Sequence, residues 1–317
     1  MSTYISYSYS CVSEFSRRIV ILGKTGAGKS SLANTLFKEN VFAANHTPES
    51  GTIECQTKSK NVNGKKIFFV DTPGFFDTKR SEEEMKPVVL KCITECAPGP
   101  HVFLIVLRVD KFTEQEKAIV ETLSSYFSEE ALKYATVLFT HGDQLPEGET
   151  IEEFVSQSED LNNLVKKCGG RCNVIDNKYW NNNPQDDYRS NKFQVNKLLN
   201  TIDKIIEANN KSYYTSDFLQ AVNKKIEEEK ERIKESSANL SPDVILEQAR
   251  ASVSGKLLHN TAGVTSGVLL KVFLSGALKI VREGEPVLGL GAALTAAIAA
   301  TIAGAAAEVP AILDAIE

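Results

Sequence analysis

The 317-residue sequence lacks an excess of basic residues, because 36 Lys and Arg stand against 41 Asp and Glu and the net charge is −5. A nucleic-acid surface is therefore not expected as the main partner. The six cysteines have no histidine at a spacing typical of zinc sites, so we interpret them as reduced, partly buried thiols. Residues 1–16 lack the basic and apolar regions of a signal peptide, and neither end carries a lipidation motif. These absences predict a cytoplasmic enzyme or switch, with residues 1–16 as a mobile tail.

A glycine-rich segment lies close to the beginning of the chain. It reads Gly23-Lys24-Thr25-Gly26-Ala27-Gly28-Lys29-Ser30, which fits the pattern G-x-x-x-x-G-K-[ST]. An apolar run at 18–22 precedes it and an apolar helical pattern at 31–37 follows it, which is the strand–loop–helix context that this motif requires. The loop and the helix N-terminus would point N–H groups at an anion. Lys29 is predicted to reach the β- and γ-phosphates of a nucleotide, and the Ser30 hydroxyl is predicted to bind Mg²⁺.

A second motif, Asp71-Thr72-Pro73-Gly74, follows the apolar run at 66–70. An acid at the end of such a strand is where nucleotide-binding proteins hold Mg²⁺. We expect Asp71 to bind the ion through water and Gly74 to donate its N–H to the γ-phosphate. In the polar loop between the two motifs, Thr52 is favoured as the threonine that closes over the ion, and Thr47 is the competing candidate.

The third motif is Thr140-His141-Gly142-Asp143, at the end of the apolar run 135–140. Asp143 can accept hydrogen bonds from N1–H and the exocyclic amine of guanine. Adenine lacks this donor pair, and a buried carboxylate left unpaired is costly, so the motif predicts GTP rather than ATP. His141 is expected to stack on the base. After the short apolar run at 171–175, Asn177 is expected to frame guanine O6, and Trp180 either walls the pocket or packs in the core.

The order of the patterns predicts an α/β fold with a mostly parallel sheet. Asn63-Gly64 joins two strand patterns and predicts an antiparallel hairpin at one edge. Helices are expected at 31–37, 81–95, 113–126, 162–168 and 190–209. In the last of these, seven apolar side chains are predicted to face inward: Phe193, Val195, Leu198, Leu199, Ile202, Ile205 and Ile206.

The composition changes after residue 260. The runs 264–281 and 287–307 are apolar, and the second has no charged residue and is long enough to span a bilayer. It is rich in Ala and Gly, however, and Lys271 interrupts the first run. The two runs could form a hairpin in a membrane, and they could equally dock as a pair of soluble helices or mediate self-assembly. Membrane contact by 261–310 is favoured slightly, with the chain on the cytosolic face of an intracellular membrane.

We therefore divide the chain into four parts. They are the tail 1–16, a nucleotide-binding domain 17–209, a charged helical extension 210–260 and the apolar segment 261–317.

Together these motifs resemble the GTPases of immunity-associated proteins, also called the immune-associated nucleotide-binding family, which is similar to the septins and the chloroplast-import receptor GTPases. The resemblance covers 17–209, and it is carried by the first motif with Ser31, by 71–78, by 101–120 and by 140–145. It implies a three-layer P-loop GTPase fold that binds GTP and GDP with Mg²⁺ and dimerises across the nucleotide face. It also implies that His141 packs against guanine, that Asp143 reads it, and that Thr52 is the switch threonine.

Two positions bear on catalysis. The family often has an arginine before a Phe-Thr pair, used across the dimer as a catalytic finger, and this sequence has Lys111 there, without the planar guanidinium fork. Lys111 is the candidate catalytic residue. Phe75 stands where many GTPases have a glutamine that orients the attacking water. We predict slow GTP hydrolysis by the isolated chain, and a nucleotide-holding scaffold that self-assembles is the alternative.

Overall fold

The computed structural model of the chain describes residues 15–42, 54–75, 81–110, 114–180, 188–237, 239–261 and 263–276. Among these residues one six-stranded sheet has the order β2-β3-β1-β4-β5-β6. Its strands are β1 Arg17–Leu22, β2 Gln56–Val62, β3 Lys65–Asp71, β4 Val102–Arg108, β5 Ala135–Thr140 and β6 Cys172–Val174. The helices are α1 Lys29–Phe37, α2 Glu82–Cys96, α3 Glu114–Tyr126, α4 Glu129–Leu132, α5 Ile151–Ser156, α6 Glu159–Lys167, α7 Asn191–Ala208, α8 Asp217–Ser236, α9 Pro242–Asn260 and α10 Ser266–Ser275, with a 3₁₀ turn at Gly142–Gln144.

The edge hairpin is the one antiparallel pair in this sheet, as the sequence predicts. β2 pairs with β3 antiparallel, and the other described neighbours are parallel. Asn63 and Gly64 both have positive φ, at 49° and 77°, which a two-residue turn with the twist of a hairpin requires. The predicted α/β fold with a mostly parallel sheet is therefore confirmed.

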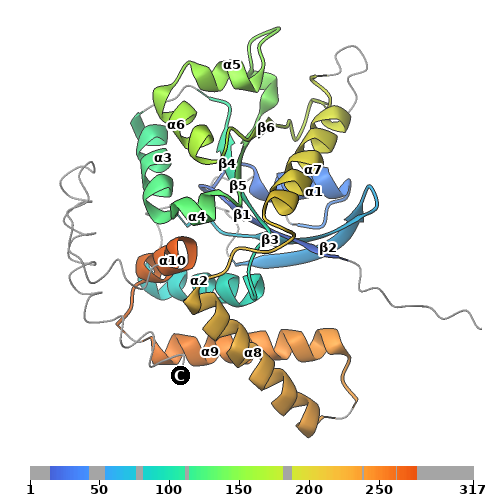
Figure 1. The fold of residues 1–317 in the computed structure, drawn as a ribbon, viewed down its shortest axis with the longest axis vertical. Helices are drawn as coiled ribbons and strands as arrows, with labels where there is room; N and C mark the ends of the chain where they lie inside the picture. The colour runs from blue at the N-terminus through green and yellow to red at the C-terminus, as the bar shows by residue number, and fades with distance from the viewer. Residues whose placement is uncertain are drawn as a thin grey trace, which may run out of the picture.

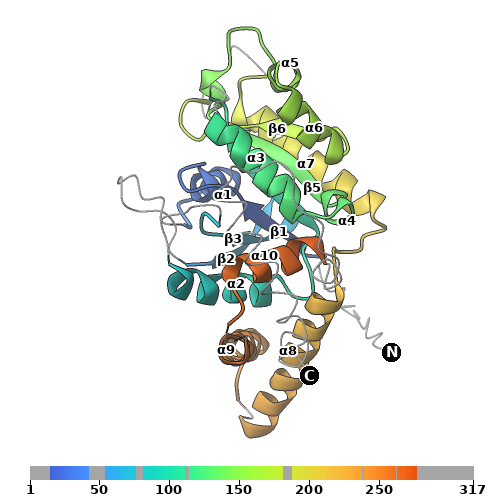
Figure 2. The same cartoon turned by 90° about the vertical axis from the view of Figure 1, so that its left-hand side faces the viewer.

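Helices cover both faces of the sheet and make three layers (Figures 1 and 2). The alternation of side chains along β1 shows how the two cores are built. Ile19 and Ile21 pack with α1 and α7 on one face, and Val20 and Leu22 pack with α2 and α3 on the other. Because every parallel strand runs the same way, the loops at their carboxyl ends gather at one edge of the sheet. The three predicted motifs lie in these loops.

One predicted core position in α7 is wrong. Phe193 is 46% exposed, whereas the other six predicted side chains are buried. At 100° per residue Phe193 falls on the face opposite the stripe that contains Val195 and Leu199, so the helical period itself places it outward. Its ring lies 6.3 Å from the ring of Tyr188 instead.

The helices after α7 form an extra layer below the sheet. α8 and α9 pack against each other, α9 packs on α2, and the pair projects from the lower end of the molecule in Figure 1. Glu229 in α8 is buried, and it accepts hydrogen bonds from Ser252 at 2.7 Å and from Lys256 at 2.8 Å in α9. The charged sequence of α8 therefore provides both a solvated face and a specific set of hydrogen bonds to α9.

The described part of the apolar C-terminal segment is a docked helix. α10 packs on α2, α3 and α4, and it buries six apolar side chains: Val268, Leu269, Leu270, Val272, Phe273 and Leu274. Among the residues that the structure describes, none of the helices combines the length and the hydropathy needed to cross a bilayer. Residues 277–317, which include the run 287–307, lie outside the described residues.

Candidate nucleotide-binding site

The loop 23–30 joins β1 to α1 and has the backbone that the motif predicts. Gly26 and Gly28 have φ values of 79° and 82°, in the left-handed region that favours glycine. Gly28 is the N-cap of α1, and within the described chain no side chain caps this helix end. Backbone N–H groups at such an end, together with the helix dipole, favour an anion. The helix axis therefore points its positive end at the place where the motif predicts a phosphate.

Lys29 is almost fully buried, with 5% of its surface exposed. Its Nζ donates to the carbonyls of Gly23 at 3.0 Å and Lys24 at 2.9 Å, so the ammonium lies across the loop. The predicted contact of Lys29 with the phosphates stays a prediction.

Ser30 and Asp71 meet at the carboxyl ends of β1 and β3. Ser30 Oγ donates to Asp71 Oδ2 at 2.6 Å. Within the described residues, the other carboxylate oxygen, Asp71 Oδ1, is buried without a hydrogen-bond partner. Burial raises the pKa of Asp71, while the Ser30 hydroxyl and the Lys29 ammonium oppose that rise. A buried carboxylate oxygen beside a hydroxyl is a donor set that suits a hard cation such as Mg²⁺. The residues present therefore fit the predicted ion.

Gly74 lies directly against the phosphate loop. A Cβ placed on it would lie 2.2 Å from Thr25 Oγ1 and 2.5 Å from Thr25 N, so no larger residue fits without movement. The Thr72 hydroxyl donates to the Ile21 carbonyl at 2.6 Å and fixes the chain just before this contact. Phe75, the next residue, packs against the core. Thr52, Thr47 and Lys111 lie outside the described residues.

The base end of the site is formed by the loops after β5 and β6. The Thr140 hydroxyl donates to the Ala27 carbonyl at 2.8 Å, which ties β5 to the phosphate loop. His141 adopts φ 58°, and its Nδ1 lies 3.1 Å from Thr140 Oγ1. Burial lowers the pKa of His141, and the Arg108 guanidinium adds to this effect. Both effects favour the neutral form of the His141 ring.

Trp180 is 4% exposed and covers Gly142, where a Cβ would lie 2.5 Å from its ring. Of the two roles considered for it, the structure shows the packing one. Asn177 is bound to the phosphate end: its Oδ1 accepts from the Thr35 hydroxyl at 3.0 Å, and its Nδ2 donates to the Gly28 carbonyl at 3.4 Å. Its predicted contact with guanine O6 stays a prediction.

Asp176 is a buried acid at this site that the sequence analysis does not single out. It is buried, with 2% of its surface exposed, and its carboxylate accepts the N–H groups of Lys178, at 2.8 Å, and Tyr179. Burial raises the pKa of Asp143, and the nearby Asp176 carboxylate raises it further. The sequence indicates Asp176 by its position two residues after β6, because an acid that follows a parallel strand lies at the same edge of the sheet as Asp71 and Asp143.

Four features of this site are typical of one class of protein. They are a glycine-rich loop that leads into a helix N-terminus, a lysine that lies across the loop, an acid beside Ser30 and a second acid in the loop after β5. They define a P-loop nucleotide-binding protein with the G-domain fold. A model of the AIG1 family matches residues 17–237, and the chain belongs to this family of GTPases. The match extends past residue 209, where the resemblance seen in the sequence ends, to the end of α8.

Two curated relatives come from Arabidopsis thaliana. Immune-associated nucleotide-binding protein 7 is 31% identical over 251 residues, which are 78% of this chain and 78% of the relative. Immune-associated nucleotide-binding protein 8 is 32% identical over 244 residues, 75% of this chain and 66% of the relative. Among solved structures, Toc33 from Arabidopsis thaliana in complex with GDP and Mg²⁺ is similar, with a TM-score of 0.46 and 21% identity over 60% of this chain and 84% of that one.

Proposed function

We propose that the chain is a switch that binds GTP and GDP together with Mg²⁺. The observation that carries this proposal is the Ser30–Asp71 contact at 2.6 Å, beside which Asp71 Oδ1 is buried with no hydrogen-bond partner among the described residues. Ser30 would bind the ion directly, Asp71 through water, and Thr52 would join them from its loop. When bound, Mg²⁺ neutralises charge on the β- and γ-phosphates.

The phosphates would lie over the loop 23–30, where Lys29 exchanges its bonds to loop carbonyls for bonds to phosphate oxygens. The N–H groups of the loop and of Ser31 would bind the remaining oxygens. Gly74, packed on Thr25, would sense the γ-phosphate through its N–H. At the other end, Asp143 would read guanine, and His141 would cover the ring.

The isolated chain hydrolyses GTP slowly in this proposal. Phe75 packs against the core and has no group that orients water. The family resemblance supports dimerisation across the nucleotide face, with Lys111 as the candidate that acts across it. Single-turnover hydrolysis, measured at several protein concentrations, tests this step. A rate that rises steeply with concentration supports catalysis in the dimer, and rapid turnover by the dilute monomer contradicts the proposal.

The bound ion can be tested separately by Asp71→Asn. We expect Mg²⁺ to strengthen GTP binding to the original chain by about tenfold or more, and to leave the affinity of Asp71→Asn almost unchanged. Calorimetric titrations with Mg²⁺ and with a chelator measure both. An equal Mg²⁺ effect in both proteins would remove Asp71 from the ion site.

The alternative is a nucleotide-holding scaffold that self-assembles. In one version of this alternative, the scaffold assembles on the cytosolic surface of a membrane. It is favoured by the apolar sequence after α10. Because α10 covers α2, α3 and α4, a chain shortened after Asn260 would lose core packing, and shortening after Gly276 is the cleaner test. If 277–317 carries membrane binding, the full chain co-sediments with lipid vesicles and the shortened chain stays in solution. Equal behaviour of the two would exclude this form of the scaffold.

A further inference from the structure

The first residue of α7 holds the loop that follows β6. This residue, Asn191, is 6% exposed. Its Oδ1 accepts the N–H of Asp176 at 3.2 Å, and its Nδ2 donates to the carbonyl of the same residue. A side-chain amide that binds both backbone groups of one residue satisfies them and fixes the direction of the chain at that point. Asn191 therefore sets the place at which the loop leaves β6.

The loop after β6 is folded back on the same residue. The Asp176 carboxylate accepts the N–H groups of Lys178, at 2.8 Å, and Tyr179. A turn of this kind is one that Asp side chains form with the backbone that follows them. Because the turn is built on Asp176, its position depends on the two backbone hydrogen bonds that Asn191 makes.

This loop also contacts the loop after β5. The N–H of Gly142 donates to the Ile175 carbonyl at 3.1 Å. The Trp180 ring covers the same glycine, since a Cβ on Gly142 would lie 2.5 Å from the ring. Gly142 directly precedes Asp143, so these two contacts fix the backbone from which the Asp143 side chain extends. The position of Asp143 therefore depends on the loop that Asn191 holds.

The residue chain just before α7 holds the loop after β5 at a second point. Arg189 Nη2 donates to the Leu145 carbonyl at 3.0 Å and also to the Pro146 carbonyl. These carbonyls follow Asp143 by two and three residues. Asp143 thus lies between two fixed points, Gly142 and Leu145, and hydrogen bonds connect both points to the beginning of α7.

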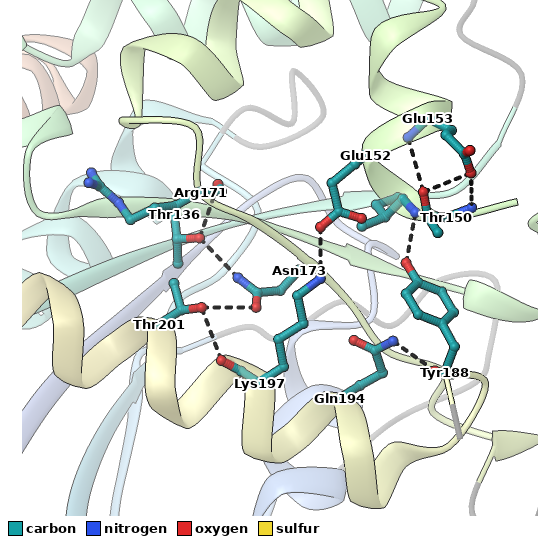
Figure 3. A network of polar contacts seen from close by, with 11 residues as sticks. Thr136, Thr150, Glu152, Glu153, Arg171, Asn173, Tyr188, Gln194, Lys197 and Thr201 are labelled. Atoms are coloured by element: carbon teal, nitrogen blue, oxygen red, sulfur yellow. Dashed lines mark hydrogen bonds and ion pairs between the residues drawn. The ribbon is translucent and has the colours of Figure 1, made fainter. Parts of the chain in front are cut away.

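Two further side chains hold this beginning of α7 in place. The Tyr188 hydroxyl accepts the N–H of Ile151, at the start of α5, at 2.7 Å. Gln194, which is 1% exposed, donates from Nε2 to the Tyr188 carbonyl at 2.7 Å. Figure 3 shows both side chains between α5 and α7. The segment that holds the base loops is therefore itself held by two helices.

We propose that Asn191 and Arg189 are positioning residues for guanine selection, which act on Asp143 through the backbone of the two base loops. This rests on the proposed binding of guanine nucleotides, in which N1–H and the amine would donate to the Asp143 oxygens. Hydrogen bonds weaken steeply when their distance and angle depart from the ideal, so a shift of these loops weakens both contacts. The phosphates would bind to the loop 23–30, which β1 and α1 position, and their contacts should persist.

The experiment compares Asn191→Ala with a matched control, Thr201→Val, in the full chain. The Thr201 hydroxyl also lies in α7, but it donates to Asn173 Oδ1, at 3.2 Å, within β6 itself (Figure 3). Asn173 is fully buried, so each variant removes a hydrogen bond between α7 and a buried partner, and both should unfold at a lower temperature. Competition against a labelled GDP measures the affinities for GDP and ADP, each with Mg²⁺.

We expect Asn191→Ala to bind GDP about tenfold more weakly than the original chain and to bind ADP within about twofold of it. The preference for guanine should therefore narrow about tenfold, whereas Thr201→Val should keep both affinities within about twofold. An unchanged preference in Asn191→Ala, or an equal loss of affinity for GDP and ADP, would overturn the inference. Failure of the original chain to bind GDP would instead overturn the proposed function.

A second variant covers the case in which Asn191→Ala does not fold. Arg189→Met changes a half-buried side chain, keeps its apolar stem and removes the guanidinium. The preference for GDP over ADP should narrow by about threefold. In combination with Asp143→Asn, the same change should cost less than about twofold in GDP affinity, because a positioning residue loses its effect once the group that it positions is replaced. Full additivity of the two substitutions, or an unchanged preference in Arg189→Met, would contradict the proposal.

Discussion

The phosphate end and the base end of the site both use a carboxylate whose pKa burial raises, but they satisfy it in different ways. Asp71 has a hydroxyl on one oxygen and nothing described on the other, which leaves room for a cation. Asp143 is partly exposed, and its carboxylate accepts a hydrogen bond from the Gln144 amide. In the proposed function the phosphate end is completed by an ion and the base end by the N–H donors of guanine.

The largest effect expected at the phosphate end comes from Lys29→Ala. Lys29 lies across the loop, and in a complex with GDP its removal deletes charge-assisted bonds to the β-phosphate oxygens, about 3 kcal/mol in all, or more than 100-fold in the affinity. Fluorescence titration with a labelled GDP measures the loss. The exposed Lys133→Ala, which removes an ion pair to Glu130, is the matched control and should change the affinity less than twofold. Equal, small effects in both variants would contradict the placement of the phosphates.

At the base end we expect a smaller loss of affinity for GDP, together with a change in which nucleotide is preferred. Asp143→Asn replaces one acceptor oxygen with a donor, so it should weaken GDP binding by about 30-fold, or about 2 kcal/mol. Xanthosine diphosphate carries an oxygen in place of the amine and should now bind more tightly than GDP. Competition between the two nucleotides measures the preference. If the preference for guanine persisted in Asp143→Asn, another residue would read the base.

The smallest expected effect tests the hydrogen bond between Thr35 and Asn177, which connects the loop after β6 to the helix that follows the phosphate loop. Thr35→Val removes the hydroxyl that holds the Asn177 amide against the phosphate loop, a neutral bond of about 1 kcal/mol. GDP affinity should fall about fivefold, with the original preference for guanine. Thr122→Val, at an exposed position where the hydroxyl bonds only to the Ala118 carbonyl of its own helix, should leave affinity unchanged. A larger loss of GDP affinity in Thr122→Val than in Thr35→Val would contradict a role for the Thr35–Asn177 hydrogen bond in nucleotide binding.

The two ends also differ in how far they could be predicted. The phosphate end is a contiguous motif, and its partner Asp71 stands at the end of a strand that the apolar pattern shows clearly. Asp143 could be predicted in the same way. The place of Asp176 after β6 is a local signal, but its hydrogen bonds to Asn191 and the pairing of β6 with β5 leave no pattern in the sequence.

The elements of the fold also divide into those that a local sequence signal predicts and those that it does not. The edge hairpin follows from Asn63-Gly64, a local signal, whereas α4 and α5 are too short to show a helical period. The apolar character of Phe193 favours an inward position, but its angle on the helix places it outward. The docking of α10 on α2, α3 and α4 could not be predicted, because an apolar run suits lipid and protein equally.

The central claim is that one pocket grips the phosphates and selects guanine. Its most direct test is calorimetric titration of the full chain at pH 7.5 with GDP and, separately, with ADP, each with Mg²⁺. The phosphate end offers both nucleotides the same loop, so any difference belongs to Asp143 and its surroundings. The account predicts tight binding of GDP and an affinity for ADP at least 100-fold weaker, because adenine lacks the N1–H and the exocyclic amine that guanine would donate to Asp143. Equal affinities, or no binding of GDP, would contradict it.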